Sequence, residues 1–405
     1  MPRNIVFVAP FPSEITMRFV RAVARLEDVK LLGIVHTPPS GADRRLYDDM
    51  VRITDPLSTS DIIEATEILR RRHGQPVRIL GILESLMVQL GEARAHFGVE
   101  GTNAHTADLF RDKSRMKTAL AQAGLPVAKN ALVHSVAEGM KVGELIGFPL
   151  VLKPPAGMGA KATFRVNSFE DLHRALNGFG VSASQPILAE EFLQGREYSY
   201  ETFTTQGIPR LASISHYQPS CLEVLENPWM QWTCMLPREI QGEEYEEIHR
   251  VGPAAIRALG LENGMTHMEW FRRPDGSVAI GEIAQRPPGA QISLMTGIVH
   301  DKNTYRAWAR SVVDNEFDGP WERKYSAGCA FLRGMGRGRV AAITGLHETH
   351  EAVGKWIVEA RLPSIGQPRN DSYEGEGYIT VRHEQTEGVQ LLLKKIIETV
   401  KIHYA

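Results

Sequence analysis

The chain has 405 residues, of which 43% are hydrophobic and 23% charged, and both values are ordinary for a globular protein. Its length favours two to four domains at roughly 100–200 residues each. The 46 basic residues nearly balance the 48 acidic ones, so neither a nucleic-acid nor a membrane partner is expected. No apolar stretch is long enough to predict a transmembrane helix or a signal peptide. The three cysteines, Cys221, Cys234 and Cys329, are too few for a disulfide framework, and a cytoplasmic location is expected.

The first hundred residues alternate between strand and helix patterns. Short apolar runs predict strands at Asn4–Pro10, Lys30–His36 and Val77–Leu83. Helical spacing predicts helices at Glu14–Leu26 and at Thr59–His73, where Ser60 is the expected N-cap. This βαβ order predicts a parallel sheet. Ligands bind beyond the strand ends of such sheets, so the loop Phe11–Ser13 is either part of a site or a plain connection.

The rest of the chain is divided by clear helix and turn signals. A helix is predicted over Ala107–Ala123, because Gly124 and Pro126 follow as stop signals. A capping box at Ser135–Glu138 opens a helix that ends at Gly147. Strands are predicted at Phe148–Lys153, Lys161–Val166, Gln185–Phe192 and Glu197–Thr205. Helices are predicted from Ser168 to about Asn177, at Glu243–Leu259 with a kink or break at Pro253, and near Glu387–Val400.

A lysine at a strand end is the first candidate site residue. The segment Phe148-Pro-Leu-Val-Leu-Lys153 reads as a buried strand, and a loop with Gly157 and Gly159 follows it. Glycines let backbone N–H groups approach a phosphate, and a lysine supplies positive charge beside it. The spacing is not that of a Walker loop, and in isolation a turn explains the two glycines better.

A hairpin is predicted to bring two glutamates together. The turn signature Arg273-Pro-Asp-Gly276 separates two strand-like segments. A two-residue loop would place Glu269 opposite Glu282, and Phe271 opposite Ile280. A four-residue loop would make the two glutamates diagonal neighbours on the same face. The sequence alone leaves both registers open.

In both registers the glutamates share a face with Arg286. Facing carboxylates repel, which indicates that a cation lies between Glu269 and Glu282. All-oxygen ligation suits Mg²⁺ that also bridges phosphates. The alternative is a solvated polar face in which Arg286 neutralises one glutamate.

A third segment ends a strand in two carboxylates and an apolar pair. It reads Leu188-Ala-Glu190-Glu191-Phe192-Leu193, and a new strand begins near Glu197. Such a crossover could offer backbone groups to a flat heterocycle. Taken alone, an acidic strand end is the better explanation.

Together these segments resemble the ATP-grasp superfamily of ligases, of the carboxylate–amine type that includes L-amino-acid ligases and biotin-carboxylase-like enzymes. The resemblance is clearest from Asp112 to Gly297, and the order of the segments carries it. Its parts are Asp112-Lys113, the Lys153 strand with its glycine loop, Glu190–Leu193 with Glu197, and Glu269 with Glu282-x-x-x-Arg286.

The resemblance implies a mixed α/β and α+β architecture in three parts. Residues 1–106 would form a βαβ N-terminal domain. Residues 107–310 would form the two-lobed nucleotide-binding fold, with a small mobile lobe at about 127–193. Residues 311–405 would form a C-terminal α+β lobe.

The resemblance also implies which residues hold ATP. Lys113 and Lys153 would bind its phosphates, Lys153 also as a catalytic residue, and the loop with Gly157 and Gly159 would close over them. Arg286 would stabilise an acyl phosphate and the tetrahedral transition state. The adenine and ribose would be contacted by Glu190, Glu191, Phe192, Leu193, Phe271 and Glu197.

The metal assignment carries one departure from the family pattern. Glu269 and Glu282 would ligate one or two Mg²⁺ ions, with Mn²⁺ as a substitute. The family usually has Glu-x-Asn-x-Arg, whereas this chain has alanine at position 284. Alanine cannot ligate, so a second ion would need water or another residue, such as Gln285 or Gln291.

The implied reaction is ADP-forming ligation of a small-molecule carboxylate, of an amino acid or small acid, to an amine. It needs no Ser/His/Asp or Cys/His arrangement, so His216, His267 and His300 are interpreted as ordinary packed residues. Alternatives are a biotin-carboxylase-like or purine-pathway ligase, and a regulatory protein that binds ATP without turnover. A homodimer is compatible with the resemblance.

Substrate identity is not predicted. Arg333 either binds a substrate carboxylate or is a surface turn arginine. The aromatic stretch Asn227–Cys234 either walls a substrate pocket or belongs to the core.

Overall fold

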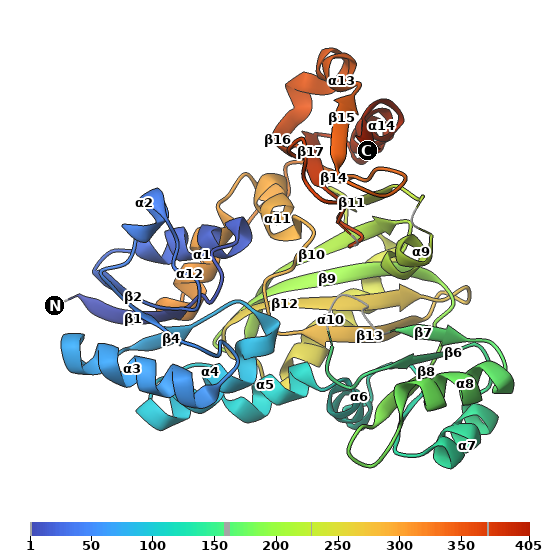
Figure 1. Ribbon diagram of the computed structural model, residues 1–405, viewed down its shortest axis with the longest axis horizontal. Coiled ribbons are helices and arrows are strands. Elements are labelled where there is room, and N and C mark those ends of the chain that lie inside the picture. Colours follow the sequence, from blue (N-terminus) through green and yellow to red (C-terminus); the bar gives the residue numbers. More distant parts are fainter. Residues whose placement is uncertain (1, 158–162, 228, 371) are drawn as a thin grey trace.

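The computed structural model describes residues 2–157, 163–227, 229–370 and 372–405. Within these residues the chain forms four sheets, with helices packed around them (Figure 1). A parallel N-terminal sheet is combined with antiparallel sheets, so the predicted mixed α/β and α+β fold class is confirmed. None of the helices in the described ranges is both long and apolar enough to cross a membrane.

The N-terminal sheet is parallel, with the strand order β3-β2-β1-β4. Its strands are β1 (Arg3–Val8), β2 (Val29–Val35), β3 (Asp49–Arg52) and β4 (Arg78–Leu80). The surrounding helices are α1 (Glu14–Ala24), α2 (Gly41–Arg44), α3 (Thr59–His73), the single turn η1 (Glu84–Leu86) and α4 (Met87–Phe97). Ile5 and Phe7 of β1 pack on the side of α1, whereas Val6 and Val8 pack on the side of α3 and α4. Both faces of the strand are therefore buried, as in other parallel sheets.

Ser58, and not Ser60, is the N-cap of α3. Ser58 has an extended backbone (φ −81°, ψ 119°), and its Oγ accepts the backbone N–H of Asp61. Ser60 lies in the first turn, where its hydroxyl is 2.8 Å from Ser58 Oγ. The run Ser58-Thr-Ser offers several hydroxyl caps, and the apolar pattern alone does not choose among them.

The helix predicted over Ala107–Ala123 is two helices, α5 (Ala104–Arg111) and α6 (Lys113–Gln122). Asp112 between them is extended (φ −91°, ψ 108°), and its carboxylate accepts the N–H groups of Ser114 and Arg115. Aspartate is a strong N-cap, so a new helix start replaces the continued helix. Lys113 is thereby placed in the first turn of α6.

A small antiparallel sheet has the order β5-β8-β6-β7. Its strands are β5 (Asn130–Val133), β6 (Leu150–Lys153), β7 (Phe164–Val166) and β8 (Ile187–Glu191). Two helices, α7 (Val136–Ile146) and α8 (Phe169–Phe179), pack on one face of it around Leu172 and Leu176 (Figure 1). Ser135 caps α7 as predicted, by accepting the N–H of Glu138.

The central sheet is antiparallel, with the order β13-β12-β9-β10-β11-β14-β17-β16. Its first five strands are β9 (Arg196–Thr205), β10 (Ile208–Gln218), β11 (Trp232–Leu236), β12 (Gly264–Arg272) and β13 (Val278–Ala284). The other three are β14 (Ser326–Leu332), β16 (Ile357–Arg361) and β17 (Gly377–His383). β11 pairs with β14 through Trp232↔Phe331 to Leu236↔Ala327. The sheet therefore runs across the predicted boundary at 310/311, and the three-part division stays a prediction.

Several helices surround the central sheet: α9 (Cys221–Glu226), η2 (Glu243–Tyr245), α10 (Glu246–Leu259), α11 (Ile292–His300) and α12 (Thr304–Val313). The C-terminal part adds α13 (Leu346–Val353), η3 (Gly354–Trp356), α14 (Thr386–Thr399) and the strand pair β15 (Val340–Thr344) with β18 (Lys401–Tyr404). The helix α10 continues through Pro253, so the predicted break does not occur there, and the predicted kink stays a prediction.

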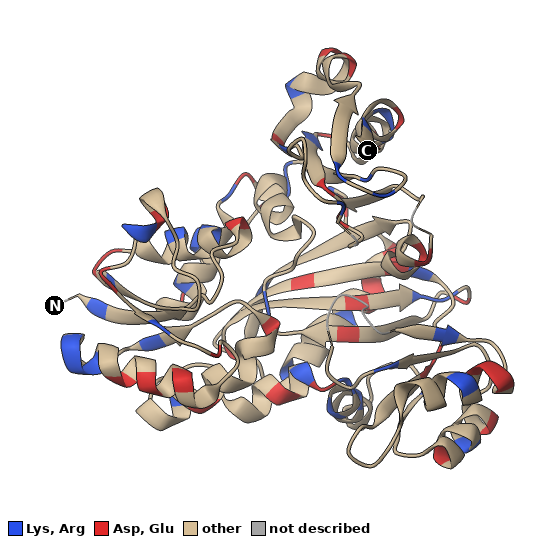
Figure 2. Ribbon diagram, in the orientation of Figure 1, with Lys and Arg blue, Asp and Glu red and all other residues tan. Residues whose placement is uncertain are grey.

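Acidic residues lie in the middle of the central sheet, on neighbouring strands (Figure 2). Glu201 is 1% exposed on β9, and Glu269 and Glu282 lie on β12 and β13. Charged groups are rarely buried without partners, because removal from water is costly. These carboxylates therefore require cationic or hydrogen-bonding partners close to this part of the sheet.

Candidate functional site

A cavity of about 610 Å³ lies between the small sheet and the central sheet, and we call it the central cavity. All the predicted site residues that the structure describes line it. They are Lys113, Lys153, Gly157, Glu190, Glu191, Phe192, Leu193, Glu197, Glu269, Phe271, Glu282 and Arg286. Gly159 lies outside the described residues. Segments that are far apart in the chain are thus brought to one place.

Neither predicted hairpin register holds along the whole pair β12 and β13. Glu269 lies opposite Glu282, as the two-residue loop predicted. Beyond a β-bulge, however, Phe271 lies opposite Ala279 instead of Ile280. The bulge places one extra residue, Gly281, on β13, and this insertion shifts the later pairs by one.

The two facing glutamates have different electrostatic surroundings. Burial and the neighbouring Glu282 raise the pKa of Glu269 above its usual value. Burial alone would also raise the pKa of Glu282, but Lys113 and Lys153 lower it below the usual value. Lys113 Nζ lies 2.9 Å from Glu282 Oε1. Glu282 is therefore stabilised as an anion. Among the described residues, the only ion-pair contact of Glu269 is with His267 Nε2, at 3.9 Å, and Lys153 and Arg286 act on it from a greater distance.

A group of lysines is held by Glu190. Lys153 Nζ lies 3.0 Å from Glu190 Oε2, and Lys117 Nζ lies 3.4 Å from Glu190 Oε1. Lys117 also donates to Gly281 O at 2.7 Å, and its side chain is 1% exposed. Burial lowers the pKa of Lys117. Sequence reasoning missed Lys117, although it lies one helical turn after Lys113 on the same face of α6.

The expected adenine hinge is only partly free to bind a heterocycle. The backbone of Glu190 pairs with Asn130 of β5 and Val151 of β6, so it is engaged in the sheet on both sides. Glu190 therefore contacts the lysines through its carboxylate, and the hinge role implied for its backbone stays a prediction. The N–H groups of Glu191 and Phe192 donate to Lys129 O and Pro149 O.

Leu193 is different from the preceding hinge residues. Within the part of the chain that the structure describes, its N–H makes no backbone hydrogen bond. Leu193 is 9% exposed and packs with Phe271, Ala128 and Ala279. An apolar wall beside a free backbone donor can bind a flat heterocycle.

Glu197 lies directly opposite Phe271 on β9 and β12. Burial, together with the charge of Glu269, raises the pKa of Glu197 to about 8. Its carboxyl group is thus mainly protonated at neutral pH in the free protein. Binding of polar hydroxyls or a cation nearby would change this balance.

Arg286 is held by a residue that sequence reasoning missed. Its Nε donates to Glu84 Oε2 at 3.0 Å, and Arg111 Nη1 donates to Glu84 Oε1 at 2.9 Å. Glu84 lies in η1, just beyond the end of β4, and its side chain is 5% exposed. A site beyond the end of a parallel strand is where ligands bind in such sheets, and this rule was the available signal.

A divalent cation fits the pair of facing carboxylates. Within the described residues, no three His, Cys, Asp or Glu side chains gather as in an all-protein metal site. Mg²⁺ commonly takes one or two carboxylates and completes its shell with phosphate oxygens and water. Glu269 and Glu282 supply the two carboxylates.

The residues suggested for a second ion do not lie in the central cavity. Gln285 Nε2 donates to Thr102 Oγ1 at 2.7 Å, outside this cavity, and Gln291 is the N-cap residue of α11. The residue opposite Ala284 is His267, which lines the cavity. Glu201 Oε1 holds His267 Nδ1 at 2.9 Å.

Two further sequence-based alternatives are placed by the structure. Arg333 does not line the central cavity, and its Nη1 donates to Ser372 O at 2.9 Å. Trp232 lines the cavity with Tyr217 and Tyr373, at ring distances of 5.9 and 4.7 Å, whereas Trp229 is 61% exposed. Among the described residues of this aromatic stretch, Trp232 is the one that lines the cavity.

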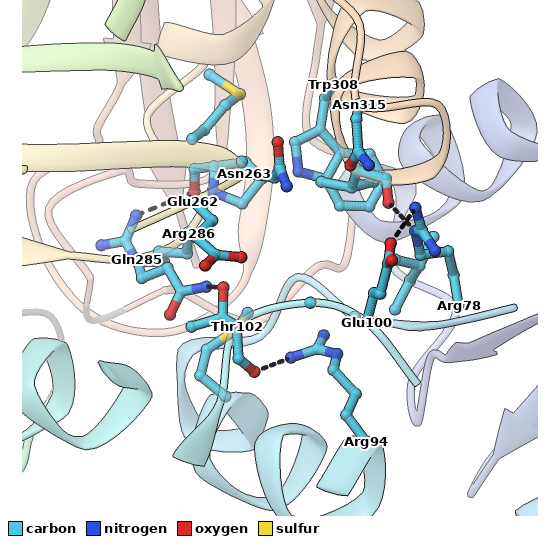
Figure 3. Close-up of a pocket in the computed structure, with 18 of the residues that line it drawn as sticks. Arg78, Arg94, Glu100, Thr102, Glu262, Asn263, Gln285, Arg286, Trp308 and Asn315 are labelled. Atoms are coloured by element: carbon cyan, nitrogen blue, oxygen red, sulfur yellow. Dashed lines mark hydrogen bonds and ion pairs between the residues drawn. The ribbon is translucent and has the colours of Figure 1, made fainter. Parts of the chain in front are cut away.

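A second cavity, of about 690 Å³, lies between the N-terminal sheet and the central sheet (Figure 3). Arg286 lines both cavities. Arg94 lines the second one and is 8% exposed, but it donates to the backbone oxygens of Ile79 and Thr102. The arginine thus holds the loop before α5 in place.

Comparison with known proteins identifies the fold. Residues 146–294 match the ATP-grasp domain family. The chain contains an ATP-grasp domain. The match includes Lys153, the segment Glu190–Leu193, Glu269, Glu282 and Arg286, but not Lys113 or Glu84.

The similarity extends beyond the ATP-grasp domain itself. Over 271 residues the chain is 28% identical to the L-arginine-specific L-amino acid ligase of Bacillus subtilis. The aligned region covers 66% of this chain and 64% of that protein. This alignment spans less than two thirds of the relative. An L-amino acid ligase from Bacillus licheniformis superimposes with a TM-score of 0.83 and 18% identity, over 100% of this chain and 99% of that one. A phosphoribosylglycinamide synthetase from Anaerococcus prevotii gives a TM-score of 0.74 and 16% identity, with 100% of both chains covered. The whole chain therefore has the ATP-grasp fold.

Proposed function

We propose that the protein is an ATP-dependent, ADP-forming ligase that joins a carboxylic acid to an amine. One observation carries this proposal. Lys113, Lys153 and Arg286 gather in a single cavity around the facing carboxylates Glu269 and Glu282. Three cations beside a carboxylate pair suit a triphosphate with its divalent ion, and phosphoryl transfer requires mainly positioning and charge neutralisation.

The reaction proceeds in two steps. A carboxylate oxygen of the substrate attacks the γ-phosphorus of ATP, the bond to the β–γ bridging oxygen breaks, and ADP leaves. The amine nitrogen then attacks the acyl carbon, the C–O bond to phosphate breaks, and the amine loses a proton as phosphate leaves. Lys113 and Lys153 bind the phosphate oxygens, and Arg286 neutralises charge that develops on the acyl phosphate.

Magnesium fits the two glutamates without a further protein ligand. Glu269 has no lysine or arginine within ion-pair distance among the described residues, so a carboxylate oxygen is left for a cation. When bound, the ion neutralises phosphate charge. One Mg²⁺ is the assignment that the two carboxylates support. A second ion, a homodimer and the cytoplasmic location stay predictions.

The carboxylate substrate is proposed to be an amino acid. Two proteins with similarity to this chain are named for L-amino acid ligation, one of them for L-arginine. Tyr217, Trp232 and Tyr373 line the central cavity together with Arg286, whose charge acts on Tyr373. Aromatic walls give room for a side chain, and an arginine can bind the carboxylate end.

The products of the reaction test the proposal. The enzyme is incubated with ATP, Mg²⁺ and a panel of amino-acid pairs, and nucleotides, phosphate and coupled product are quantified by chromatography. We expect ADP, phosphate and ligated product in equal amounts. Dominant AMP and pyrophosphate would contradict the mechanism, and ATP binding without turnover on any pair would contradict the function. ADP release that requires bicarbonate but no amine would indicate a carboxylase instead.

A further inference from the structure

We propose that Glu84 is a positioning residue, which holds Arg286 against the reacting groups of the ligase. The proposal rests on the proposed function. It assigns a role to a residue of the N-terminal domain, which lies 202 positions before the arginine that it contacts. It also lies outside the ATP-grasp match at residues 146–294.

The two oxygens of Glu84 are each taken by a different arginine. Oε1 accepts Arg111 Nη1 at 2.9 Å, and Oε2 accepts Arg286 Nε at 3.0 Å. The Glu84 side chain is 5% exposed, so solvent screens these contacts little. The backbone of Glu84 is fixed in the turn η1, which directly precedes α4. The carboxylate is therefore a rigid anchor.

The anchor leaves one edge of the Arg286 guanidinium for a ligand. Nε is bound to Glu84, and Nη1 donates to Pro287 O at 3.2 Å. Nη2 makes no hydrogen bond within the part of the chain that the structure describes. An arginine side chain has several rotatable bonds, and fixing its head in advance removes a cost that binding would otherwise carry.

The charges also favour positioning over direct contact with the substrate. A lone carboxylate beside a phosphate would repel it. Arg111 and Arg286 together exceed the charge of Glu84 by one, so the group as a whole stays cationic. Arg111 Nη1 also donates to Gly157 O at 3.1 Å, at the start of the glycine loop. Glu84 thus orients one arginine toward the loop and one toward the acyl phosphate.

A purely structural tie between the domains is the competing explanation, and kinetics separate the two. Glu84→Gln keeps the size of the side chain but removes its charge. We expect turnover to fall 10- to 100-fold, with the KM for ATP within about threefold of wild type. Without Glu84 to hold it, the guanidinium of Arg286 keeps its charge but loses its fixed orientation. Glu84→Asp keeps the charge but has a shorter side chain, so it should cause a smaller loss of turnover. This variant replaces Glu84→Gln in the measurement if the glutamine variant does not fold.

A matched control removes a carboxylate with the same pattern of contacts elsewhere. Glu67 also binds two arginines, Arg70 at 2.7 Å and Arg71 at 2.9 Å, but on α3. Glu67→Gln should leave turnover within twofold of wild type. Equal losses in both variants would show a general effect of charge removal and would overturn the proposal.

The decisive measurement is a double-mutant cycle with Arg286→Ala. If Glu84 acts through Arg286, the double variant with Glu84→Gln and Arg286→Ala should have a turnover less than about threefold below that of Arg286→Ala alone. If the two losses multiply, or if Glu84→Gln alone leaves turnover unchanged, the proposal is wrong. A contribution through Arg111 is measured in the same way with Arg111→Gln.

A second readout does not depend on turnover. If wild type releases no ADP with any substrate pair, the proposed function fails, but the pairing can still be measured. The Nε–H signal of Arg286 in ¹⁵N NMR, assigned by its loss in Arg286→Lys, should exchange with water at least tenfold faster in Glu84→Gln than in wild type. An unchanged exchange rate would show that Glu84 does not hold the arginine.

Discussion

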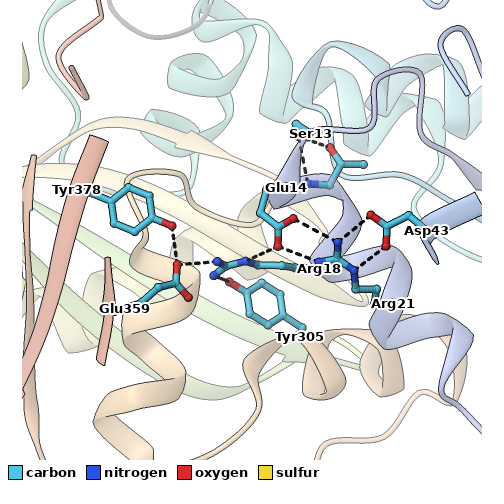
Figure 4. Close-up of polar contacts among 9 residues, drawn as sticks. Ser13, Glu14, Arg18, Arg21, Asp43, Tyr305, Glu359 and Tyr378 are labelled. Atoms are coloured by element: carbon cyan, nitrogen blue, oxygen red, sulfur yellow. Dashed lines mark hydrogen bonds and ion pairs between the residues drawn. The ribbon is translucent and has the colours of Figure 1, made fainter. Parts of the chain in front are cut away.

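Two groups of ion pairs join the N-terminal sheet and its helices to the rest of the chain. The first is the cavity network of Glu84, Arg111 and Arg286. The second, the surface network, is drawn in Figure 4 and consists of Glu14, Arg18, Arg21, Asp43 and Glu359, with Tyr305 and Tyr378. In it Arg18 of α1 reaches Glu359 of β16 at 2.6 Å, so it also connects distant parts of the sequence.

The networks use the same chemistry, but their exposure differs. Glu84 is 5% exposed, whereas Glu14, which also accepts two arginines, is 46% exposed. Exposed ion pairs are screened by water and salt, and each contributes roughly 0–1 kcal/mol. Loss of one partner of a buried pair leaves an uncompensated charge and costs more. The buried cavity network can therefore fix the orientation of a side chain, whereas the more exposed surface network adds only to stability.

The largest difference between the networks should appear in catalysis. Arg286→Ala is expected to lower turnover by about a hundredfold or more, because one preorganised donor to the acyl phosphate is lost. ATP binding should change little, since the lysines remain. Arg18→Ala in the surface network should leave turnover within twofold. Steady-state ADP release compares the two variants, and similar losses in both would contradict the distinction.

A lysine pair extends the comparison to ATP binding. Lys153 is 14% exposed and lies 3.0 Å from Glu190, whereas Lys395 is 40% exposed and lies 2.6 Å from Glu348 on the surface. Lys153→Met should weaken ATP binding by about ten- to a hundredfold, because a phosphate loses a charge-assisted partner. Lys395→Met should not change it. Calorimetry with a non-hydrolysable ATP analogue measures both, and normal affinity of a folded Lys153 variant would contradict its assignment.

Buried charge in the central cavity should also make stability depend on pH. The pKa of Glu197 is about 8 in the folded protein, against an ordinary value of 4.5. The folded state then binds the proton more tightly, so stability is lost as pH rises from about 4.5 to about 8.

Glu197→Gln should remove part of that loss, on the order of 1–3 kcal/mol at pH 8 and little at pH 5. The exposed Glu223 on α9 provides the control, and Glu223→Gln should leave the pH dependence unchanged. Urea unfolding of the metal-free protein at both pH values measures the difference. Equal effects of Glu197→Gln at pH 5 and pH 8 would disprove the shifted pKa.

The smallest effect is expected in the surface network itself. Arg18→Ala should lower the free energy of unfolding by about 1 kcal/mol or less, because its pairs are partly exposed. This loss should shrink further at 1 M salt, where the Debye length is about 3 Å. Unfolding in low and high salt checks it. A loss of several kcal/mol that salt does not reduce would place this network with the buried one.

The sequence predicted the members of the central cavity better than their contacts. Local sequence signals predicted these members. Lys153 lies at a strand end before a glycine loop, and a hairpin turn separates Glu269 from Glu282. Both signals can be read without the tertiary structure. The bulge at Gly281 is marked only by a glycine inside a strand pattern, and the predicted registers did not allow for it, so the pairing beyond it was wrong. The contacts of Glu190 were also not predicted from the sequence, because its carboxylate forms an ion pair with Lys153, which lies on another strand.

Residues from other parts of the fold could not be predicted in this way. The position of Glu84 beyond a parallel strand indicates a site, but its contact with Arg286 depends on the N-terminal sheet lying against the central one, which no local pattern predicts. Lys117 and His267 also depend on partners on other elements. Lys117 is paired with Glu190, and His267 is paired with Glu201. Helix starts depend on similar choices, since Asp112 broke a helix that the apolar spacing predicted as continuous.

The strand pair β11 and β14 has a consequence for how the protein is made. Every residue of β11 is buried, and Trp232, Cys234 and Leu236 pack with Cys329 and Phe331. While residues after 325 are still on the ribosome, β11 has an open edge and these side chains lack their cover. Unpaired edges and exposed apolar side chains are where nascent chains aggregate. The central sheet is therefore completed beside β11 only after β14 (Ser326–Leu332) has left the ribosome.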